Sequence, residues 1–128
     1  MGKNMIIVDT DVLIEIFDKK SLKGESALEE IEKSGENIAI TSISLHEILY
    51  GIYKFGKNRI SEVEKLETIE FTKEDAILSA KLEFDAEKKG CCLSRTDAMI
   101  AAIALNKKAK LFTFNKKHYQ FIPKLLLF

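Results

Sequence analysis

The chain of 128 residues has few of the features that mark a linker, a secreted scaffold or a membrane protein. It has a single proline, and no glycine- or serine-rich segment, low-complexity run or internal repeat. The longest apolar run, Ala98 to Leu105, has eight residues, far fewer than the ~20 that a membrane helix needs. With 46% hydrophobic residues the chain can bury one sizeable core. We therefore expect a single domain over residues 1–128 and no membrane span.

Cysteine is scarce as well. The only two cysteines, Cys91 and Cys92, are adjacent, and neighbouring cysteines rarely form a disulfide. A single pair without a matching second pair is not a zinc site. The N-terminal apolar run is too short for a signal peptide and leads directly into acidic residues. We expect two reduced thiols in a cytoplasmic protein.

Negative charge is absent from the last part of the chain. From Ala98 onward there are six lysines and no acidic residue, whereas the first 97 residues carry 14 basic and 20 acidic groups, a net of −6. A basic C-terminal quarter suits a polyanionic partner. Lysines on a solvated surface give the same distribution, so the charge alone leaves both interpretations open.

The N-terminal stretch is the most informative part of the sequence. Four apolar residues, Met5 to Val8, run directly into Asp9-Thr10-Asp11. Such a run is typical of a strand buried on both faces, as in the middle of a parallel sheet. In open α/β sheets ligands bind beyond the carboxyl ends of the strands. A carboxylate at that point needs a partner such as a metal ion, although Asp9 or Thr10 would also serve as a helix cap.

Hydrophobic periodicity divides the rest of the chain into alternating helices and strands. Strands are expected over 5–8, 37–40, 68–71, 110–114 and 122–128, and helices over 10–20, 23–34, 41–55, 59–66, 72–89 and 94–106. The 72–89 helix is expected to carry Ile77, Ala80 and Phe84 inward. The 94–106 helix is apolar nearly all round and is therefore expected to be covered on several sides. The alternation predicts an α/β fold with a mostly parallel sheet and right-handed crossovers.

Asp97 lies three residues after Ser94, at the start of the most apolar helix. Ser-x-x-Asp resembles a capping box, in which the acidic residue stabilises the helix N-terminus. The segment from Thr72 to Asp75 has the same form and no obvious functional role. The spacing by itself therefore does not distinguish a catalytic Asp97 from a structural one.

Glu47 lies three residues after Ser44, and Gly51 follows one turn later, where glycine leaves room for a ligand or another backbone. At ~100° per residue, Glu47 lies roughly 160° from the middle of the apolar stripe of its helix. That stripe is formed by Leu45, Ile48, Leu49 and Ile52, and Tyr53 continues the helical spacing. Glu47 is thus predicted on the solvent side, unless the helix leans over a cleft and buries its stripe elsewhere, for example in a subunit interface.

Three further polar residues follow the strand expected at 110–114. Asn115 comes directly after it, where Asn also favours turns. His118 is a possible general base in a basic loop. Tyr119 could stack on a base, although a packing role is also expected of a tyrosine here.

Taken together, these positions resemble the PIN domain, and within it the VapC-type toxins of toxin–antitoxin pairs. The match spans the whole chain. It consists of the apolar strand ending in Asp9-Thr10-Asp11, then Thr41-x-x-Ser44-x-x-Glu47-x-x-x-Gly51, then Ser94-x-x-Asp97-Ala98-x-Ile100-Ala101-Ala102, and last Leu111-Phe112-Thr113-x-Asn115 followed by Lys117-His118-Tyr119. The resemblance implies a three-layer α/β/α fold with a central, mostly parallel sheet in the order 3-2-1-4-5.

The resemblance also implies a ribonuclease that hydrolyses RNA phosphodiesters with Mg²⁺ or Mn²⁺ and metal-activated water. By position, Asp9, Glu47 and Asp97 would be the acidic metal ligands, and Asn115 would take a fourth catalytic position. The family often has Asp there, and Asn is a poorer cation ligand, so one or two metals remain possible. Carboxylates are the ligands that Mg²⁺ and Mn²⁺ prefer.

For partners, the resemblance implies an RNA substrate, a VapB-type antitoxin that covers the cleft, and a homodimer. Thr10, Lys116, Lys117 and His118 would contact the substrate, the lysines through its phosphates. Three alternatives stay open: a PIN-like protein that binds RNA or a partner without cleaving, a PIN nuclease of ribosomal RNA processing, and a haloacid-dehalogenase-like phosphatase. In the phosphatase Asp9 would be the nucleophile and Asp11 the general acid.

Overall fold

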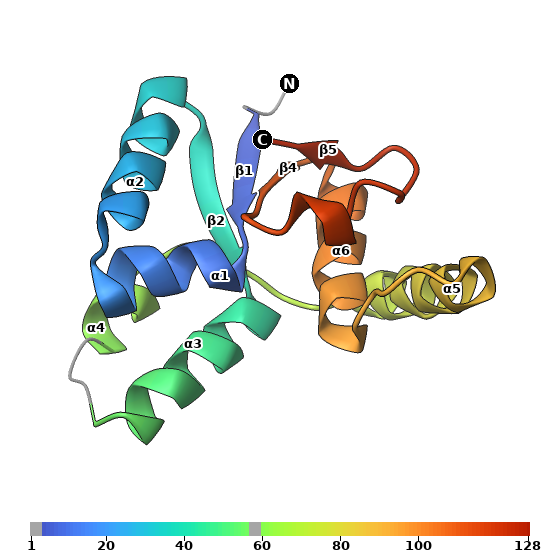
Figure 1. Cartoon of the computed structure of the whole chain (residues 1–128), viewed down its shortest axis with the longest axis horizontal. Helices are drawn as coiled ribbons and strands as arrows, with labels where there is room; N and C mark the ends of the chain where they lie inside the picture. Colours follow the sequence, from blue (N-terminus) through green and yellow to red (C-terminus); the bar gives the residue numbers. More distant parts are fainter. Residues whose placement is uncertain (1–3, 57–59) are drawn as a thin grey trace.

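The computed structural model describes residues 4–56 and 60–128, which form a five-stranded sheet between two layers of helices (Figure 1). The strands are β1 (Met5–Val8), β2 (Asn37–Thr41), β3 (Thr68–Ile69), β4 (Lys110–Phe112) and β5 (Leu126–Leu127). Their order is β3-β2-β1-β4-β5 and every neighbouring pair is parallel. β1 is the middle strand, with Ile7 beside Ala39 of β2 and Leu111 of β4. The predicted strand order is confirmed.

Alternate residues of β1 face opposite sides of the sheet, and each side carries its own core. Ile6 and Val8 pack in a core with α1 (Thr10–Leu13), α2 (Leu22–Ser34), α3 (Ser42–Lys54) and α4 (Ile60–Glu64). Ile7 packs on the other side with α6 (Arg95–Lys107), over which α5 (Lys73–Lys89) lies. All three side chains are at most 1% exposed. The three-layer α/β/α architecture and the covered position of α6 are therefore confirmed.

The first helix departs from the single α-helix predicted over 10–20. After α1 the chain continues as a wider π-helix, η1 (Ile14–Lys19), and ends at Lys20 with a left-handed backbone. α2 packs tightly on this turn, because a Cβ at Gly24 would lie 2.3 Å from the carbonyl oxygen of Glu15. No residue larger than glycine fits at position 24.

The predicted inward face of α5 is wrong. Ile77 and Phe84 are 65% and 55% exposed, and Ala80 is exposed as well. The buried face is anchored by a polar residue, Asp75, which accepts a hydrogen bond from Nδ2 of Asn106 in α6 at 2.7 Å. Ser79 and Ala86 are buried on the same face, and hydropathy does not reveal a buried face that begins with polar residues.

Smaller differences concern the ends of elements. The strands expected over 68–71, 110–114 and 122–128 are shorter, and the helix expected over 59–66 is α4, whose predicted first residue lies outside the described residues. Both cysteines are free, as expected. In the part of the chain that the structure describes, no helix has the length and apolar character needed to cross a membrane.

Candidate active site

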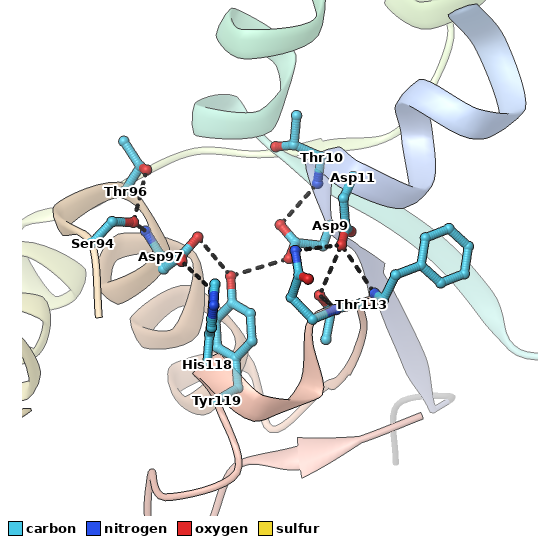
Figure 2. A network of polar contacts seen from close by, with 11 residues as sticks. Asp9, Thr10, Asp11, Ser94, Thr96, Asp97, Thr113, His118 and Tyr119 are labelled. Atoms are coloured by element: carbon cyan, nitrogen blue, oxygen red, sulfur yellow. Dashed lines mark hydrogen bonds and ion pairs between the residues drawn. The ribbon is translucent and has the colours of Figure 1, made fainter. Parts of the chain in front are cut away.

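The polar residues of the site meet where β1 and β4 end (Figure 2). Asp9 follows β1 directly, and its backbone N–H continues the sheet by donating to the carbonyl of Phe112 at 2.9 Å. Its Oδ1 accepts from the backbone N–H of Thr10 at 2.8 Å, so Asp9 caps α1. The capping role uses one carboxylate oxygen and leaves Oδ2 for the site.

One hydroxyl connects the two aspartates that come from opposite ends of the chain. The Tyr119 Oη lies 3.1 Å from Oδ2 of Asp9 and 2.9 Å from Oδ1 of Asp97, at hydrogen-bond distance from both (Figure 2). Asp9 is 5% exposed and Tyr119 is 1% exposed, whereas the Asp97 side chain retains 25% exposure. The structure therefore brings Asp9 and Asp97 to either side of a single buried hydroxyl.

Asp97 only partly follows the capping-box pattern. Its backbone N–H donates to Oγ of Ser94 at 3.1 Å, as in a capped helix. Its carboxylate, however, turns toward Tyr119, and Oδ2 faces Nδ1 of His118 at 3.7 Å, an ion-pair distance when the imidazole is protonated. His118 and Tyr119 are supplied by the short 3₁₀ turn η2 (Lys116–His118) and the residue after it. This turn brings the C-terminal segment against the start of α6.

The electrostatics reflect buried negative charge. Burial and, to a lesser extent, the charges of Asp11 and Asp97 together raise the pKa of Asp9 to about 6, against the lowering effect of the hydrogen bonds from Thr113 and Thr10. Burial and the two adjacent carboxylates also raise the pKa of Tyr119, so its hydroxyl keeps its proton. The site therefore has an excess of negative charge that a cation would offset.

Glu47 joins the site through Thr10. Its Oε1 accepts from the Thr10 hydroxyl at 2.7 Å, and the same hydroxyl lies 3.0 Å from Oγ of Ser44. The buried face of α3 is centred on Ile48, with Ser44 and Ile52 one turn to either side. Glu47 is thus only about 100° from that centre and is half-buried, and the prediction of a solvent position is wrong. The buried face is shifted toward Glu47 because it includes the polar Ser44, whereas Leu45 and Leu49 of the predicted stripe are only partly buried.

Asn115 is directed at Asp11. Its Nδ2 donates to Oδ2 of Asp11 at 3.1 Å, and the backbone N–H of Phe114 donates to the same oxygen at 3.1 Å. The other Asp11 oxygen is buried and has no hydrogen-bond partner among the described residues. Burial raises the pKa of Asp11. Asp11 ties the start of α1 to the loop after β4, a contact over more than 100 residues that local spacing does not predict.

Most of the chain matches a known protein family. Residues 6–122 match the model of the PIN domain. The chain belongs to the PIN-domain family. The phosphatase alternative is therefore wrong, because its mechanism belongs to a different fold.

Relatives of this PIN domain are ribonucleases by name. Ribonuclease VapC2 of Rickettsia felis is 30% identical over a 127-residue alignment that covers 94% of each chain. Ribonuclease VapC1 of Methanocaldococcus jannaschii is 31% identical over 120 residues, 92% of this chain and 81% of the relative. A crystal structure of VapBC2 from Rickettsia felis bound to a promoter DNA fragment contains a chain that superposes with a TM-score of 0.78 at 27% identity, covering 97% of both chains. The resemblance stated from the motifs is confirmed.

The donor set of this PIN domain fits a hard divalent cation. Across residues 4–56 and 60–128, no three Asp, Glu, His or Cys side chains gather closely enough to enclose a metal ion. Two carboxylates do meet, and proteins commonly hold Mg²⁺ through one or two carboxylates while water and substrate phosphates complete its shell. Asp9 and Asp97 are therefore the residues that could hold such an ion, and Glu47 contacts Thr10, the residue that follows Asp9.

A basic groove of about 540 Å³ lies beside the site. It shares the loop after β4 with the site, and three lysines, Lys23, Lys116 and Lys117, line it. Nζ of Lys23 lies 4.1 Å from the ring centre of Phe114, a cation–π contact. Glu30 is an acidic residue in the same lining. The groove offers positive charge next to the paired carboxylates.

Proposed function

We propose that residues 1–128 form a single PIN domain that is an endoribonuclease dependent on Mg²⁺ or Mn²⁺. The observation that carries the proposal is the meeting of Asp9 and Asp97 at one hydroxyl, at the carboxyl end of the central strands. The names of the relatives, Ribonuclease VapC2 and Ribonuclease VapC1, support RNA as the substrate. The phosphate backbone of RNA suits the lysines of the adjacent groove.

Each residue of the site has a part in this reaction. Asp9 and Asp97 would hold the cation, which when bound supplies hydroxide from water and neutralises phosphate charge. Glu47, held by the Thr10 hydroxyl at 2.7 Å, would accept the proton of the attacking water. Asn115 would contact a substrate oxygen. Because Asn115 is neutral and hydrogen-bonds Asp11, we expect one protein-held cation rather than two.

Substrate contacts come from the residues around the pair. Lys116 and Lys117, both exposed, would bind phosphates on either side of the cut. His118 lies 3.7 Å from Asp97 and would contact the phosphate near the scissile bond. Thr10 would act through its hydroxyl, which positions Glu47.

We further propose that the protein is the toxin of a VapBC-type pair, silenced by a VapB-type antitoxin, and that it forms a homodimer in the cytoplasm. The solved relative from Rickettsia felis is a VapBC2 complex. Three aromatic side chains near the end of α3, Tyr50, Tyr53 and Phe55, are more than 60% exposed. Apolar surface of this kind marks protein interfaces. The free thiols of Cys91 and Cys92 suit a reducing compartment.

One other function has an observation in its favour. A PIN domain that binds RNA without cleaving it is compatible with the neutral Asn115 and with the lack of a third carboxylate ligand within the described residues. It predicts that RNA is retained intact even when Mn²⁺ is in excess.

A cleavage assay on mixed cellular RNA tests the proposal. We expect the wild-type protein to cleave with Mg²⁺ or Mn²⁺, and both the chelator EDTA and Asp9→Asn to abolish cleavage. Asp85→Asn is the matched control, because Asp85 is a half-buried carboxylate paired with Lys81 on α5, a helix that supplies no residue of the site. Cleavage by Asp9→Asn at the wild-type rate contradicts the ligand assignment, and intact bound RNA supports the binding module instead.

A further inference from the structure

The Tyr119 hydroxyl has a special position, because its two hydrogen-bond partners are the two carboxylates of the site. The ring of Tyr119 belongs to the core between the sheet and α6, where it is 1% exposed. A phenylalanine would fill that space without burying a polar atom, and burying an unbonded hydroxyl costs free energy. The hydroxyl is therefore not needed for packing. Its contacts point to the site.

We propose that Tyr119 is a positioning residue that holds Asp9 and Asp97 in the arrangement that binds the divalent cation. The inference rests on the proposed metal-dependent function and adds a residue to it. Hydrogen bonds to ionised carboxylates are roughly twice as strong as bonds between neutral groups. Partners that orient metal ligands in this way contribute substantially to metal affinity.

Asp97 depends on Tyr119 more than Asp9 does. Asp9 is 5% exposed and is also held by the backbone N–H of Thr10 at 2.8 Å. Asp97 lies in the first turn of α6 with a quarter of its side chain exposed, and its second oxygen has, among the described residues, the longer 3.7 Å approach of His118. Without the hydroxyl, the Asp97 carboxylate is free to rotate toward solvent or toward the N-terminus of its own helix.

The hydroxyl orients the carboxylates without replacing the cation. It has one proton, so it donates to one carboxylate at a time and cannot neutralise both. The negative charge that remains is the charge that binds a cation. Tyr119 thus prepares the pair for the ion and stays beside it as a partner of the ligands.

Tyr119→Phe tests the inference, because it removes the hydroxyl and keeps the ring. Mn²⁺ binding is measured by calorimetry on the full chain, together with RNA cleavage as a function of Mn²⁺ concentration and thermal unfolding in EDTA. We expect Mn²⁺ affinity to fall roughly 10- to 100-fold, while kcat at saturating Mn²⁺ stays close to wild type. The melting temperature in EDTA should change little. Ser79→Ala, which removes a buried hydroxyl from α5, should bind Mn²⁺ as wild type does.

Several outcomes overturn the inference. Unchanged Mn²⁺ affinity in Tyr119→Phe shows that the hydroxyl does not position the ligands, and tighter binding shows that it competes with the cation. Loss of the folded state in EDTA shows that the hydroxyl is structural. If wild type binds Mn²⁺ and cleaves RNA, these results overturn the role of Tyr119 alone. If wild type binds no Mn²⁺, the proposed function fails together with it.

Discussion

Two helices of this PIN domain begin with the same local pattern and use it differently. At the start of α5, both hydrogen bonds of a capping box form. Thr72 Oγ1 accepts from the backbone N–H of Asp75 at 3.2 Å, and Asp75 Oδ2 accepts from the backbone N–H of Thr72 at 2.9 Å. At the start of α6, the backbone N–H of Asp97 donates to Ser94 Oγ, but the Asp97 carboxylate does not complete the capping box. It turns away from the helix terminus to the Tyr119 hydroxyl at 2.9 Å. A hydroxyl-x-x-Asp pattern thus serves the helix in one case and the site in the other.

The difference lies in the long-range partner of each aspartate. The remaining oxygen of Asp75 accepts from the amide of Asn106, a neutral donor, at 2.7 Å, and the side chain is 4% exposed. Asp97 faces a second aspartate across a hydroxyl and keeps contact with solvent. A carboxylate satisfied within the fold is structural, whereas one left facing another carboxylate is available for a cation.

The largest effect expected from this comparison is on cleavage. Asp97→Asn should lower RNA cleavage on the order of 1,000-fold or more, because it removes a ligand charge from the site. Asp75→Asn should leave cleavage unchanged and lower the free energy of unfolding by about 1–3 kcal/mol, since its amide cannot accept at both oxygen positions. Cleavage rates below the melting temperature and urea unfolding measure both. A folded Asp75→Asn protein without activity would contradict the assignment of Asp75 to a purely structural role.

A smaller effect concerns pH. The pKa of Asp9 is about 6 in the fold against an ordinary value of 3.8, so between these pH values the folded chain binds a proton that the unfolded chain has released. The free energy of unfolding of the metal-free protein should therefore fall as the pH rises from 4 to 6, on the order of 3 kcal/mol from Asp9.

Urea unfolding in EDTA across this pH range measures the effect. Asp9→Asn should lose that part of the pH dependence and be more stable than wild type at pH 7, whereas Asp75→Asn should retain it. Added Mn²⁺ should restore stability to wild type at pH 7, because a bound cation offsets the buried charge. Identical pH profiles for wild type and Asp9→Asn would contradict this account.

The smallest effect concerns the hydroxyls of the two caps. Thr72→Ala and Ser94→Ala each remove the acceptor of a backbone N–H and should lower the free energy of unfolding by about 1 kcal/mol. Thr72→Ala should leave cleavage unchanged, because α5 supplies no residue of the site. Denaturant titrations of the two variants check the stability change, and equal cleavage by Thr72→Ala and wild type checks the separation of roles.

The architecture could be predicted because it follows from local patterns. The apolar run before Asp9 is typical of a central strand, and its predicted place in the middle of a parallel sheet is confirmed. Asp9 was a candidate because it follows that strand, and the same strand-end rule pointed to Asn115. Asp97 could not be separated from Asp75 by spacing, since both have the same local form.

The remaining features depend on contacts between distant residues. The Tyr119 hydroxyl reaches Asp9 across 110 positions only because η2 turns the chain back, and no local periodicity encodes that turn. Hydropathy predicts the wrong face of α5 because the buried face includes the polar Asp75 and Ser79, and Asp75 is bonded to Asn106 of α6. Hydropathy predicts Glu47 in solvent because it does not count the polar Ser44 as part of the buried face of α3.

Mn²⁺ titration of wild type, Asp97→Asn and Asp75→Asn tests the central claim most directly. The account predicts that wild type and Asp75→Asn bind Mn²⁺ with the same affinity, and that Asp97→Asn loses more than the 10- to 100-fold typical of an outer partner, so over roughly 100-fold. Wild-type affinity in Asp97→Asn would contradict the account, because the two aspartates would then not share a cation.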